Sequence, residues 1–437
     1  MENKNVLIVA PFFAPQTHAA VFRAFKMAKY LKRFDWHPIV LTVDTNYTYL
    51  EDEDMIREIQ GVPIYKAKYI EPTLRGLLMT ITKKDRSYKN IRPHISNKDN
   101  SEDSPATERK SFLHKCYYYL LERYFMNPDR FRFWEKRALK EAVKLIRNQN
   151  IGIVFTTASP YSALQLGDEL KKRTGVKWVA DFRDPLTYAC KTYSFMDKVY
   201  NKQKKIIINT LKNSDFITFT SPAYSQIFLD MYGSVHISKS RFIPTGVDND
   251  YIPEIKDIEK DNTLAFVGEY LLEYGDEFLK SFANFLLNSK LEVKLKIIGN
   301  IDINKNTMMP ILKKLRIEDK IIFIDHLSQK KLYYEIKKSM GVLLITGSKA
   351  HWWNIFAKLI DYIGLELPVL ALLPETSVAR TELEKARLGI FLNDQNFENI
   401  LTNIVEGKIS ISPDKEYCKR YLASTQVNEF IKVFKSL

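Results

Sequence analysis

The feature that most constrains the fold is an alternation of short, nearly continuous apolar runs with segments of helical periodicity. Strands that are buried on both faces of a parallel sheet produce such runs, and the crossover helices produce the segments between them. The alternation runs through the first half of the chain and starts again in the second half. The predicted strands are residues 6–10, 38–43, 151–156, 177–181 and 216–220, followed by 263–268, 295–299, 321–324, 341–345 and 368–372.

The segments between these runs have the pattern of amphipathic helices. Within residues 19–34, Val21, Phe25 and Leu31 share one stripe, while Lys26 and Lys29 lie opposite. Residues 133–148 repeat the pattern. No repeat with a period of 20–50 residues occurs, which excludes solenoids. The expected fold class is α/β, with two Rossmann-like doubly wound domains facing a cleft.

The domain boundaries follow from the place where the periodicity lapses. A chain of 437 residues with 45% hydrophobic positions can bury two large cores. We expect an N-terminal domain over residues 1–248, a C-terminal domain over 263–410, and a terminal helix within 411–437 that packs back on the N-terminal domain. Charged and polar residues dominate 82–110, which we interpret as a mobile loop.

The charge balance favours an anionic partner. Lysine and arginine number 66 and the acids 52, so the formal net charge is 66 − 52 = +14. A nucleic acid, a small molecule with phosphates or an acidic membrane surface would each fit. The lysines are scattered and not interleaved with aromatic residues in a stripe, so we expect no nucleic acid partner.

The cysteines and the N-terminus indicate a cytoplasmic protein, and we expect neither a metal nor a cofactor. Cys116, Cys190 and Cys418 are far apart and lack the spacing of zinc ligands or a disulfide framework. The Asp-x-Asp at residues 248–250 lies in the expected linker, and we expect no metal there. The apolar run at 6–10 is too short for a signal peptide or a membrane span.

Residues 112–125 are rich in aromatic and basic side chains. One interpretation is a helix that docks at the inner face of the cell membrane, because aromatic rings with cationic neighbours suit the headgroup region. The alternative is a partly buried core helix.

Ligands of an open doubly wound sheet bind beyond the carboxyl ends of the strands, which selects few residues of the first half. The turn after residue 181 is the richest, because Arg183 and Asp184 place a guanidinium and a carboxylate there. The alternative is an Arg–Asp pair that merely ties the loop together, because such pairs are common at strand ends. Candidate cleft or acceptor contacts follow the first and third strands; they are Thr17, His18, Arg23, Ser159 and Tyr161.

In the second half, the strand ends give Gly268 and the run Asp325, His326 and Leu327. Lys358 and Asp361 are three apart on a helix that we expect to start near Phe356, so they share one face. A helix N-terminus with a lysine is an anion site, and a carboxylate can accept hydrogen bonds from sugar hydroxyls. A surface ion pair between the two side chains is the alternative.

At these positions the chain resembles bacterial glycosyltransferases of family 4 (group 1), which have the GT-B fold. The resemblance covers nearly the whole chain. Its carriers are the opening strand, loop and helix over residues 6–31, the motif WVADFRDP at 178–185, and AKLIDY at 357–362 followed by PVLA at 368–371. The ordinary dinucleotide and triphosphate loops rich in glycine are absent.

The resemblance implies roles for individual residues. Asp361 stands where the family's acidic residue holds the nucleotide ribose, and Lys358 where a base meets the donor diphosphate. Arg183, next to Asp184, takes the place of an active-site histidine. Residues 325–327 fall in the loop that contacts the nucleotide base.

Two departures from the family pattern are visible. Residues 16–20 replace the paired glycines of the first loop, and Glu269 and Tyr270 replace an arginine and lysine of the second domain. The expected function is retaining, metal-independent transfer of a sugar from a nucleotide-diphosphate donor to a saccharide or lipid-linked acceptor in surface polysaccharide synthesis. The alternatives are a partner subunit without turnover and a nucleotide-sugar epimerase.

Overall fold

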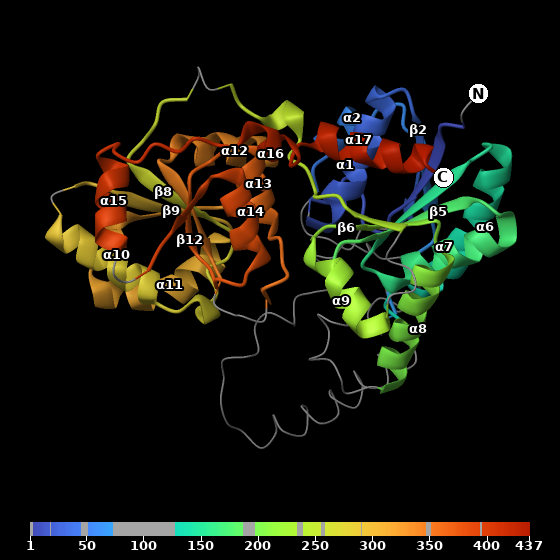
Figure 1. Cartoon of the computed structure of the whole chain (residues 1–437), viewed down its shortest axis with the longest axis horizontal. Coiled ribbons are helices and arrows are strands. Elements are labelled where there is room, and N and C mark those ends of the chain that lie inside the picture. Colours follow the sequence, from blue (N-terminus) through green and yellow to red (C-terminus); the bar gives the residue numbers. More distant parts are fainter. Residues whose placement is uncertain are drawn as a thin grey trace, which may run out of the picture. The chain divides into compact units, whose positions relative to one another are not determined.

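The computed structural model describes residues 3–17, 19–44, 51–72, 127–186, 197–233, 239–254, 258–289, 291–346, 351–393 and 396–437. The chain divides into two compact units, each built on one parallel sheet (Figure 1). Unit 1 comprises Met1–Thr220, Tyr224–Ile243 and Glu429–Leu437. Unit 2 comprises Ser221–Ala223 and Pro244–Asn428. His18, the polar loop 82–110, the segment 112–125, Cys116 and Cys190 lie outside the described residues.

Unit 1 contains a seven-stranded parallel sheet in the order β3-β2-β1-β4-β5-β6-β7. The apolar runs predicted as strands all form strands, with ends shifted by up to two residues. Three-dimensional pairing adds two short edge strands that the sequence did not identify, β3 and β7. The strands are β1 (Asn5–Val9), β2 (His37–Val43), β3 (Ile64–Ala67), β4 (Ile153–Ala158), β5 (Lys177–Phe182), β6 (Phe216–Phe219) and β7 (Ser240–Phe242).

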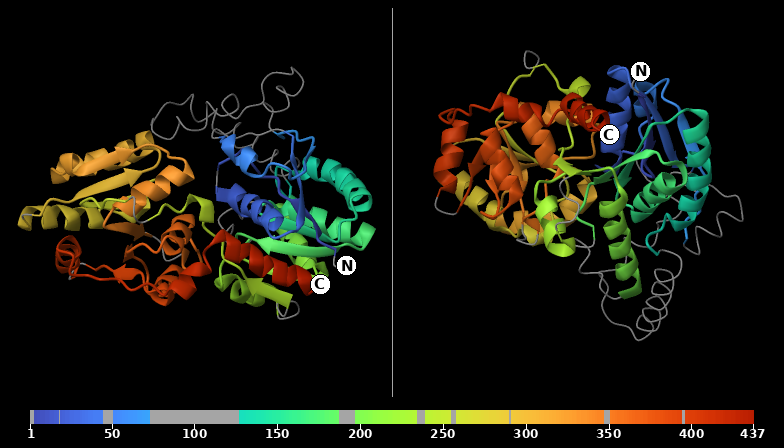
Figure 2. Two further views of the ribbon diagram at one scale, coloured as in Figure 1. Left: turned by 90° about the horizontal axis from the view of Figure 1, so that it is seen from above. Right: turned by 45° about the vertical axis from the view of Figure 1, so that its right-hand side comes forward.

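Helices cover both faces of this sheet (Figures 1 and 2). α6, α7 and α8 form a row in which α7 packs on both β4 and β5, and α1 packs against β2. The predicted helices 19–34 and 133–148 correspond to α1 and α6. The helices are α1 (Ala19–Arg33), α2 (Asp54–Glu58), α6 (Arg132–Asn148), α7 (Tyr161–Thr174), α8 (Asp197–Asn213) and α9 (Ala223–Tyr232).

The last turns of the C-terminal helix α17 (Ala423–Lys435) belong to unit 1. The Phe430 ring lies 5.2 Å from that of Phe155 on β4, and the Phe434 ring 5.6 Å from that of Trp36. These contacts bury the apolar stripe of α17 on the sheet of unit 1.

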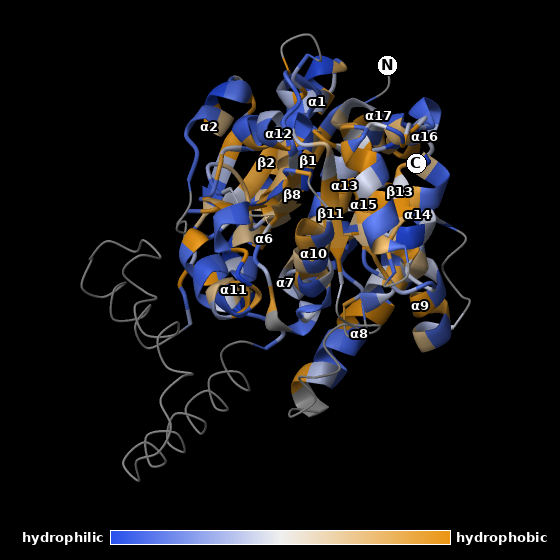
Figure 3. Ribbon diagram, turned by 90° about the vertical axis from the view of Figure 1, so that its left-hand side faces the viewer, coloured by the Kyte–Doolittle hydropathy of each residue, from blue (hydrophilic) through white to orange (hydrophobic). Residues whose placement is uncertain are grey.

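Unit 2 contains a six-stranded parallel sheet in the order β10-β9-β8-β11-β12-β13. Its first five strands were predicted, and the short edge strand β13 was not. The interior of the sheet is apolar, as the orange strands of Figure 3 show. The strands are β8 (Thr263–Val267), β9 (Lys294–Ile298), β10 (Ile321–Ile324), β11 (Gly341–Ile345), β12 (Val369–Leu372) and β13 (Gly389–Phe391).

The helices of unit 2 form two groups around its sheet (Figure 1). α10, α11 and α15 contribute to one apolar core with β8 and β9, while α13 packs against β11, α14 and α16. The elements are η3 (Asn249–Tyr251), η5 (Leu272–Tyr274), α10 (Glu277–Asn288), α11 (Ile301–Leu315), η6 (Glu318–Lys320), α12 (Gln329–Lys338), α13 (Ala357–Gly364), α14 (Val378–Ala386), α15 (Phe397–Val405) and α16 (Lys415–Lys419).

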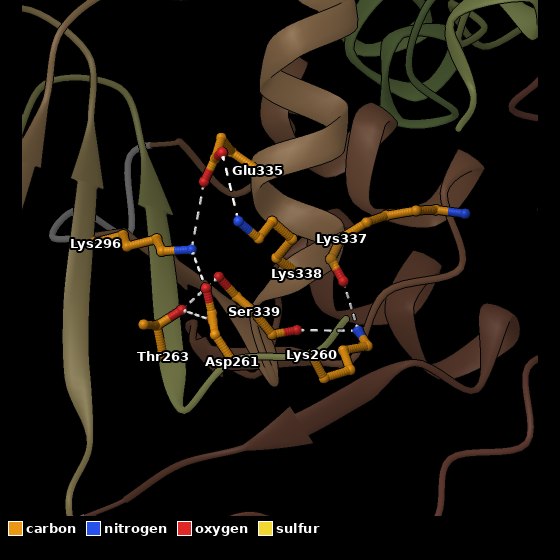
Figure 4. A network of polar contacts seen from close by, with 8 residues as sticks. All are labelled: Lys260, Asp261, Thr263, Lys296, Glu335, Lys337, Lys338 and Ser339. Carbon is orange, nitrogen blue, oxygen red and sulfur yellow. Dashed lines mark hydrogen bonds and ion pairs between the residues drawn. The ribbon is translucent and has the colours of Figure 1, made fainter. Parts of the chain in front are cut away.

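A network of charged and polar side chains lies near the amino-terminal ends of the strands β8 and β9 (Figure 4). Lys296 of β9 is almost fully buried and pairs with Asp261 and with Glu335 of α12, at 3.4 Å from the latter. Lys260 donates to the backbone carbonyls of Lys337 and Ser339 at 2.7 and 3.1 Å. The last carbonyls of α12 therefore gain cationic donors, an arrangement that stabilises a helix C-terminus.

Candidate functional site

The strand order fixes where each unit presents its loops to a ligand. In unit 2, β8 lies between β9 and β11. After β8 the chain adds β9 and β10 on one side of it, and it then crosses over to add β11, β12 and β13 on the other side. In open α/β sheets, the crevice at the carboxyl ends of two such strands is where ligands bind. The loops after β8 and β11 are therefore the first place to search.

Lys358 lies at this place, in the first turn of α13. Its ammonium nitrogen Nζ is 4.1 Å from the centre of the Phe266 ring on β8 and 5.6 Å from that of Tyr274 on η5. Burial lowers the pKa of Lys358 to about 8. Within the described part of the chain, no ion pair joins Lys358 to a carboxylate. The Lys358 side chain is half-buried with its ammonium against two aromatic rings, and an anion placed beside it would stabilise the charged form.

The helix that carries Lys358 adds to this electrostatic character. The predicted start is confirmed, because α13 begins at Ala357 with Phe356 as its N-cap residue. Phenylalanine has no polar side-chain atom with which to cap the first N–H groups. The helix dipole and the lysine thus favour negative charge at the same end of α13.

Asp361 follows one turn later, and its carboxylate is held by a neighbouring helix. The Tyr333 hydroxyl of α12 donates a hydrogen bond of 2.7 Å to Asp361 Oδ1. Lys358 and Asp361 form no ion pair with each other in the part of the chain that the structure describes. The observed arrangement therefore does not match the simple surface ion pair that the spacing left open.

Gly268 ends β8 in a backbone conformation that favours glycine, with φ of +111°. The buried Asn304 of α11 fixes this turn, because its side chain donates to the Gly268 carbonyl at 3.1 Å and accepts from the Tyr270 N–H at 2.7 Å. Gly299 is required nearby, since a Cβ there would lie 2.6 Å from the Gly268 oxygen. The turn beside Lys358 is therefore rigidly supported.

The other residues predicted for the donor lie at the edge of the sheet. Asp325, His326 and Leu327 follow β10, the edge strand of the sheet, and β9 lies between β10 and β8. Asp325 and His326 are exposed, and the His326 N–H donates to Asp325 Oδ1 at 2.8 Å. The structure places them at the same end of the sheet as Gly268, but two strands away from β8.

In unit 1 the equivalent crevice lies at the carboxyl ends of β1 and β4. Arg183 reaches it from the turn after β5, donating from Nη1 to the Ala20 carbonyl at 2.7 Å and from Nη2 to the Ser159 carbonyl. Burial lowers the pKa of Arg183. Its Nε is buried and has no hydrogen-bond partner among the residues that the structure describes. Arg183 thus ties the start of α1 to the loop after β4.

Asp184 lies next to Arg183 and is exposed to solvent on part of its surface. The carboxylate accepts a hydrogen bond from the Ser159 N–H. Reduced hydration by the surrounding protein raises the pKa of Asp184, and the Arg183 guanidinium opposes that effect. Ser159, half-buried, therefore contacts both members of the predicted turn through its backbone.

Arg23 occupies a buried structural position rather than the surface position expected of an acceptor contact. Its side chain is 1% exposed and binds the fully buried Asp181 through two hydrogen bonds of 2.8 and 2.7 Å. Thr157 and Thr218 donate to the same carboxylate. A bidentate pair with all of these donors is a fixed support for the end of β5.

The remaining acceptor candidates lie in the loops and helix starts that follow β1 and β4. Tyr161, in the first turn of α7, is 5% exposed, and Thr17 is half-buried in the loop before α1. His18 lies outside the described residues.

Sequence reasoning did not find Tyr333, Asn304, Phe266 or Tyr274 as parts of the site. The aromatic residues at positions 266, 270 and 274, spaced four apart, are the sequence pattern that could have indicated Phe266 and Tyr274. No sequence pattern indicates Tyr333, because it lies 28 residues from Asp361 in the chain.

The described residues contain no helix that is both long and apolar enough to span a membrane. They also contain no group of three or more histidine, cysteine, aspartate and glutamate residues that could hold a metal ion.

Comparison by sequence finds no match, whereas comparison by structure finds many. No family model matches the chain, and no curated protein does. HepE of Anabaena, solved in complex with UDP-glucose, is similar with a TM-score of 0.60 at 11% identity, over 99% of this chain and 100% of that one.

Two further structures give the same result. The lipopolysaccharide outer core galactosyltransferase WaaB matches with a TM-score of 0.54 at 10% identity over 99% of both chains. A putative UDP-N-acetylglucosamine 2-epimerase of Listeria monocytogenes matches with a TM-score of 0.54 at 12% identity, over 99% of this chain and 96% of that one. The chain therefore has the fold of the GT-B glycosyltransferases, with two parallel-sheet α/β domains.

Proposed function

We propose that the protein is a glycosyltransferase that takes its sugar from a nucleotide-diphosphate donor bound by unit 2. The observation that carries the proposal is Lys358, a desolvated ammonium at a helix N-terminus at the crevice of the sheet. HepE, which has the same fold, is solved with UDP-glucose, and WaaB is a galactosyltransferase. These likenesses support a nucleotide sugar as the substrate.

The donor would be held by residues of unit 2. Lys358 and the N-terminus of α13 would bind the diphosphate, and Asp361 would accept a hydrogen bond from a ribose hydroxyl. Gly268 leaves open space beside this edge, because a Cβ at its position would meet no atom within 4 Å. Asp325, His326 and Leu327 would contact the base from the loop after β10, two strands from β8 at the same end of the sheet.

The chemical step breaks the bond between the sugar and the diphosphate, so negative charge develops on the departing phosphate. A fixed ammonium and a helix N-terminus stabilise that charge more than they stabilise the intact donor. We further propose that transfer retains the anomeric configuration, with a phosphate oxygen taking the acceptor proton, as the family 4 resemblance implies. This scheme assigns no role to a metal ion.

Unit 1 would bind the acceptor, a saccharide or lipid-linked saccharide in surface polysaccharide synthesis. Asp184 and Arg183 are the proposed catalytic turn, with Thr17, Ser159 and Tyr161 as nearby contacts. A guanidinium has five N–H donors, and Arg183 uses two of them on backbone carbonyls. The remaining donors leave it able to bind a ligand oxygen as well.

A nucleotide-sugar epimerase is the second candidate, favoured by the similarity to the Listeria structure. Both functions require the same donor site. They differ in the product, because an epimerase changes the sugar without needing an acceptor, whereas a transferase moves it.

The two candidates can be separated with a panel of nucleotide sugars, incubated with and without lipid and saccharide acceptors. The proposed function predicts release of nucleoside diphosphate that depends on Lys358 and increases when the acceptor is present. An altered sugar still attached to its nucleotide would identify the epimerase. Failure of every donor to bind would instead support a partner subunit without turnover.

A further inference from the structure

The hydroxyl of Tyr333 is an internal hydrogen-bond donor that holds the Asp361 carboxylate. Tyr333 is 0% exposed, so no water reaches its ring or its hydroxyl. The O–H donates to Asp361 Oδ1 at 2.7 Å, the length of a strong bond to a charged acceptor. The bond joins α12 to α13, which follow different strands of the sheet.

The protonation state of this donor is fixed. Burial, together with the Asp361 carboxylate, raises the pKa of Tyr333 well above its ordinary value. The buried Asp248, the N-cap residue of η3, adds a second negative charge nearby. Near neutral pH Tyr333 therefore keeps its proton and acts as an O–H donor to Asp361.

The aromatic ring is held as firmly as the hydroxyl. α12 packs against η3, and the Tyr333 side chain is buried there with no exposed surface. A fully buried tyrosine has few alternative rotamers, so it restricts the position of the oxygen atom to which it donates. One oxygen of Asp361 thus has a defined place before any ligand arrives.

We propose that Tyr333 is a positioning residue that orients Asp361 toward one ribose hydroxyl of the nucleotide donor; this inference rests on the proposed function. A free aspartate samples several side-chain torsions, and ordering it on binding weakens affinity. The bond from Tyr333 orders it in advance. Tyr333 thereby sets how strongly the site distinguishes a nucleotide with that hydroxyl from one without it.

The test compares UDP with 2′-deoxy-UDP and 3′-deoxy-UDP by isothermal titration. A hydrogen bond to a carboxylate corresponds to about tenfold or more in affinity, so the wild type should prefer UDP over at least one analogue by that factor. Tyr333→Phe should weaken UDP binding about five- to tenfold and leave binding of that analogue unchanged. The preference should shrink accordingly.

Tyr421→Phe is the matched control. Tyr421 is also 0% exposed in unit 2, and its hydroxyl donates at 2.6 Å to a different carboxylate, that of Glu382. The control loses the same kind of bond in an equally buried place. It should retain the full preference for UDP.

A second variant pair covers the case in which Tyr333→Phe alone does not fold. In an Asp361→Ala background, adding Tyr333→Phe should leave UDP affinity at the Asp361→Ala value, because Tyr333 acts only through Asp361. A further loss in the double variant would show an independent role and overturn the inference.

Other outcomes separate this inference from the proposed function. Equal weakening of UDP and both analogues by Tyr333→Phe, or no change, would overturn the positioning role even if Lys358→Ala still abolishes UDP binding. Absence of wild-type binding to UDP and to every other nucleoside diphosphate tried would overturn the proposed function itself.

Discussion

At the scale of single residues, Lys358 is the most informative side chain of the candidate site. It combines a place at the helix N-terminus, contacts with two aromatic rings and a pKa lowered by burial to about 8. Each of these points to an anionic ligand, and together they predict how binding depends on pH.

Nucleoside diphosphate binding should weaken above pH 8. Phosphate favours the charged form of Lys358, and near pH 7 that form dominates because the pKa is about 8. Between pH 7 and pH 9 most of the charge is lost, so affinity should fall about tenfold. Lys358→Ala should bind about tenfold or more weakly even at pH 7.

Lys358→Arg is the control for this titration, because a guanidinium stays charged over the whole range. Isothermal titration at pH 7, 8 and 9 compares the three proteins. An identical pH dependence in the wild type and Lys358→Arg would contradict the assignment.

Arg183 gives the second prediction at this scale. Arg183→Lys keeps the charge but cannot reach both the Ala20 and Ser159 carbonyls, so unit 1 should lose about 1–3 kcal/mol of stability. Melting and turnover should be measured together, with turnover read well below the melting temperature. We expect turnover to fall there as well, since the loops at the proposed acceptor edge lose their tie.

Arg173→Lys, at an exposed pair with Glu169 on α7, is the comparison for Arg183→Lys. It should change neither quantity. An Arg183→Lys protein with wild-type melting and reduced turnover would indicate direct contact with substrate, and one with both unchanged would remove Arg183 from the site.

At the scale of elements, the sequence predicted the central strands and the edge strand β10 well, whereas the edge strands β3, β7 and β13 were missed. Val6 to Val9 and Leu264 to Phe266 are buried on both sides, so their apolar runs were unmistakable. β3 reads Ile-Tyr-Lys-Ala and β13 only Gly-Ile-Phe, too short and too mixed for a period to appear. These short edge strands are defined by pairing with their neighbour in the sheet, which local sequence does not record, whereas the apolar run of β10 was long enough to be recognised.

The residues of the candidate site also differ in how well the sequence predicts their contacts. The sequence predicted that Lys358 and Asp361 lie on one helix at a three-residue spacing, and α13 carries both; their role in binding a donor stays a prediction. The buried pairing of Arg23 with Asp181 was not predicted, because the two residues are 158 positions apart in the chain. Tyr333 was missed for the same reason. Contacts within an element can be read from sequence, and contacts that the fold creates cannot.

Helix α6 carries a prediction about stability and pH. Glu135 is buried, and burial raises its pKa from 4.5 to about 7. Between about pH 4.5 and pH 7, Glu135 is protonated in the folded protein but ionised in the unfolded chain. The free energy of unfolding therefore decreases as pH rises from about 4.5 to 7 and then levels off. The charged groups that act on Glu135 are Lys202, Asp129, Glu169 and Lys136.

Glu135→Gln should therefore melt at a higher temperature than the wild type at pH 8 and at nearly the same temperature at pH 5. The difference at pH 8 corresponds to about 1–3 kcal/mol. Glu141→Gln, an exposed position on the same helix, is the control and should show no such pH dependence. Equal effects of Glu135→Gln at both pH values would contradict the raised pKa.

At the scale of the whole molecule, the net charge of +14 has to be matched to a partner. The anionic donor accounts for little of this positive charge. Among the described residues of unit 2, we assign one lysine, Lys358, to the diphosphate. We propose that the protein is cytoplasmic and binds an anionic membrane surface peripherally. The aromatic and basic segment 112–125, which lies outside the described residues, is the expected contact.

Liposome flotation tests this attachment. Each basic residue near an anionic surface contributes about 1 kcal/mol, and buried aromatic rings add a part that salt does not screen. Binding should rise with the fraction of anionic lipid, fall partly with salt, and fall further when Tyr117, Tyr118 and Phe125 are changed to serine. Protein that stays in the soluble fraction at low salt on strongly anionic vesicles would contradict the proposal.

A crystal structure of the protein with a bound nucleoside diphosphate would show whether Lys358 and Asp361 of unit 2 bind the donor. We expect a phosphate oxygen within about 2.7–3.2 Å of Lys358 Nζ and a ribose hydroxyl at the same distance from the Asp361 carboxylate. A nucleotide bound elsewhere, with Lys358 still over the Phe266 ring and no phosphate beside it, would contradict the proposed donor site.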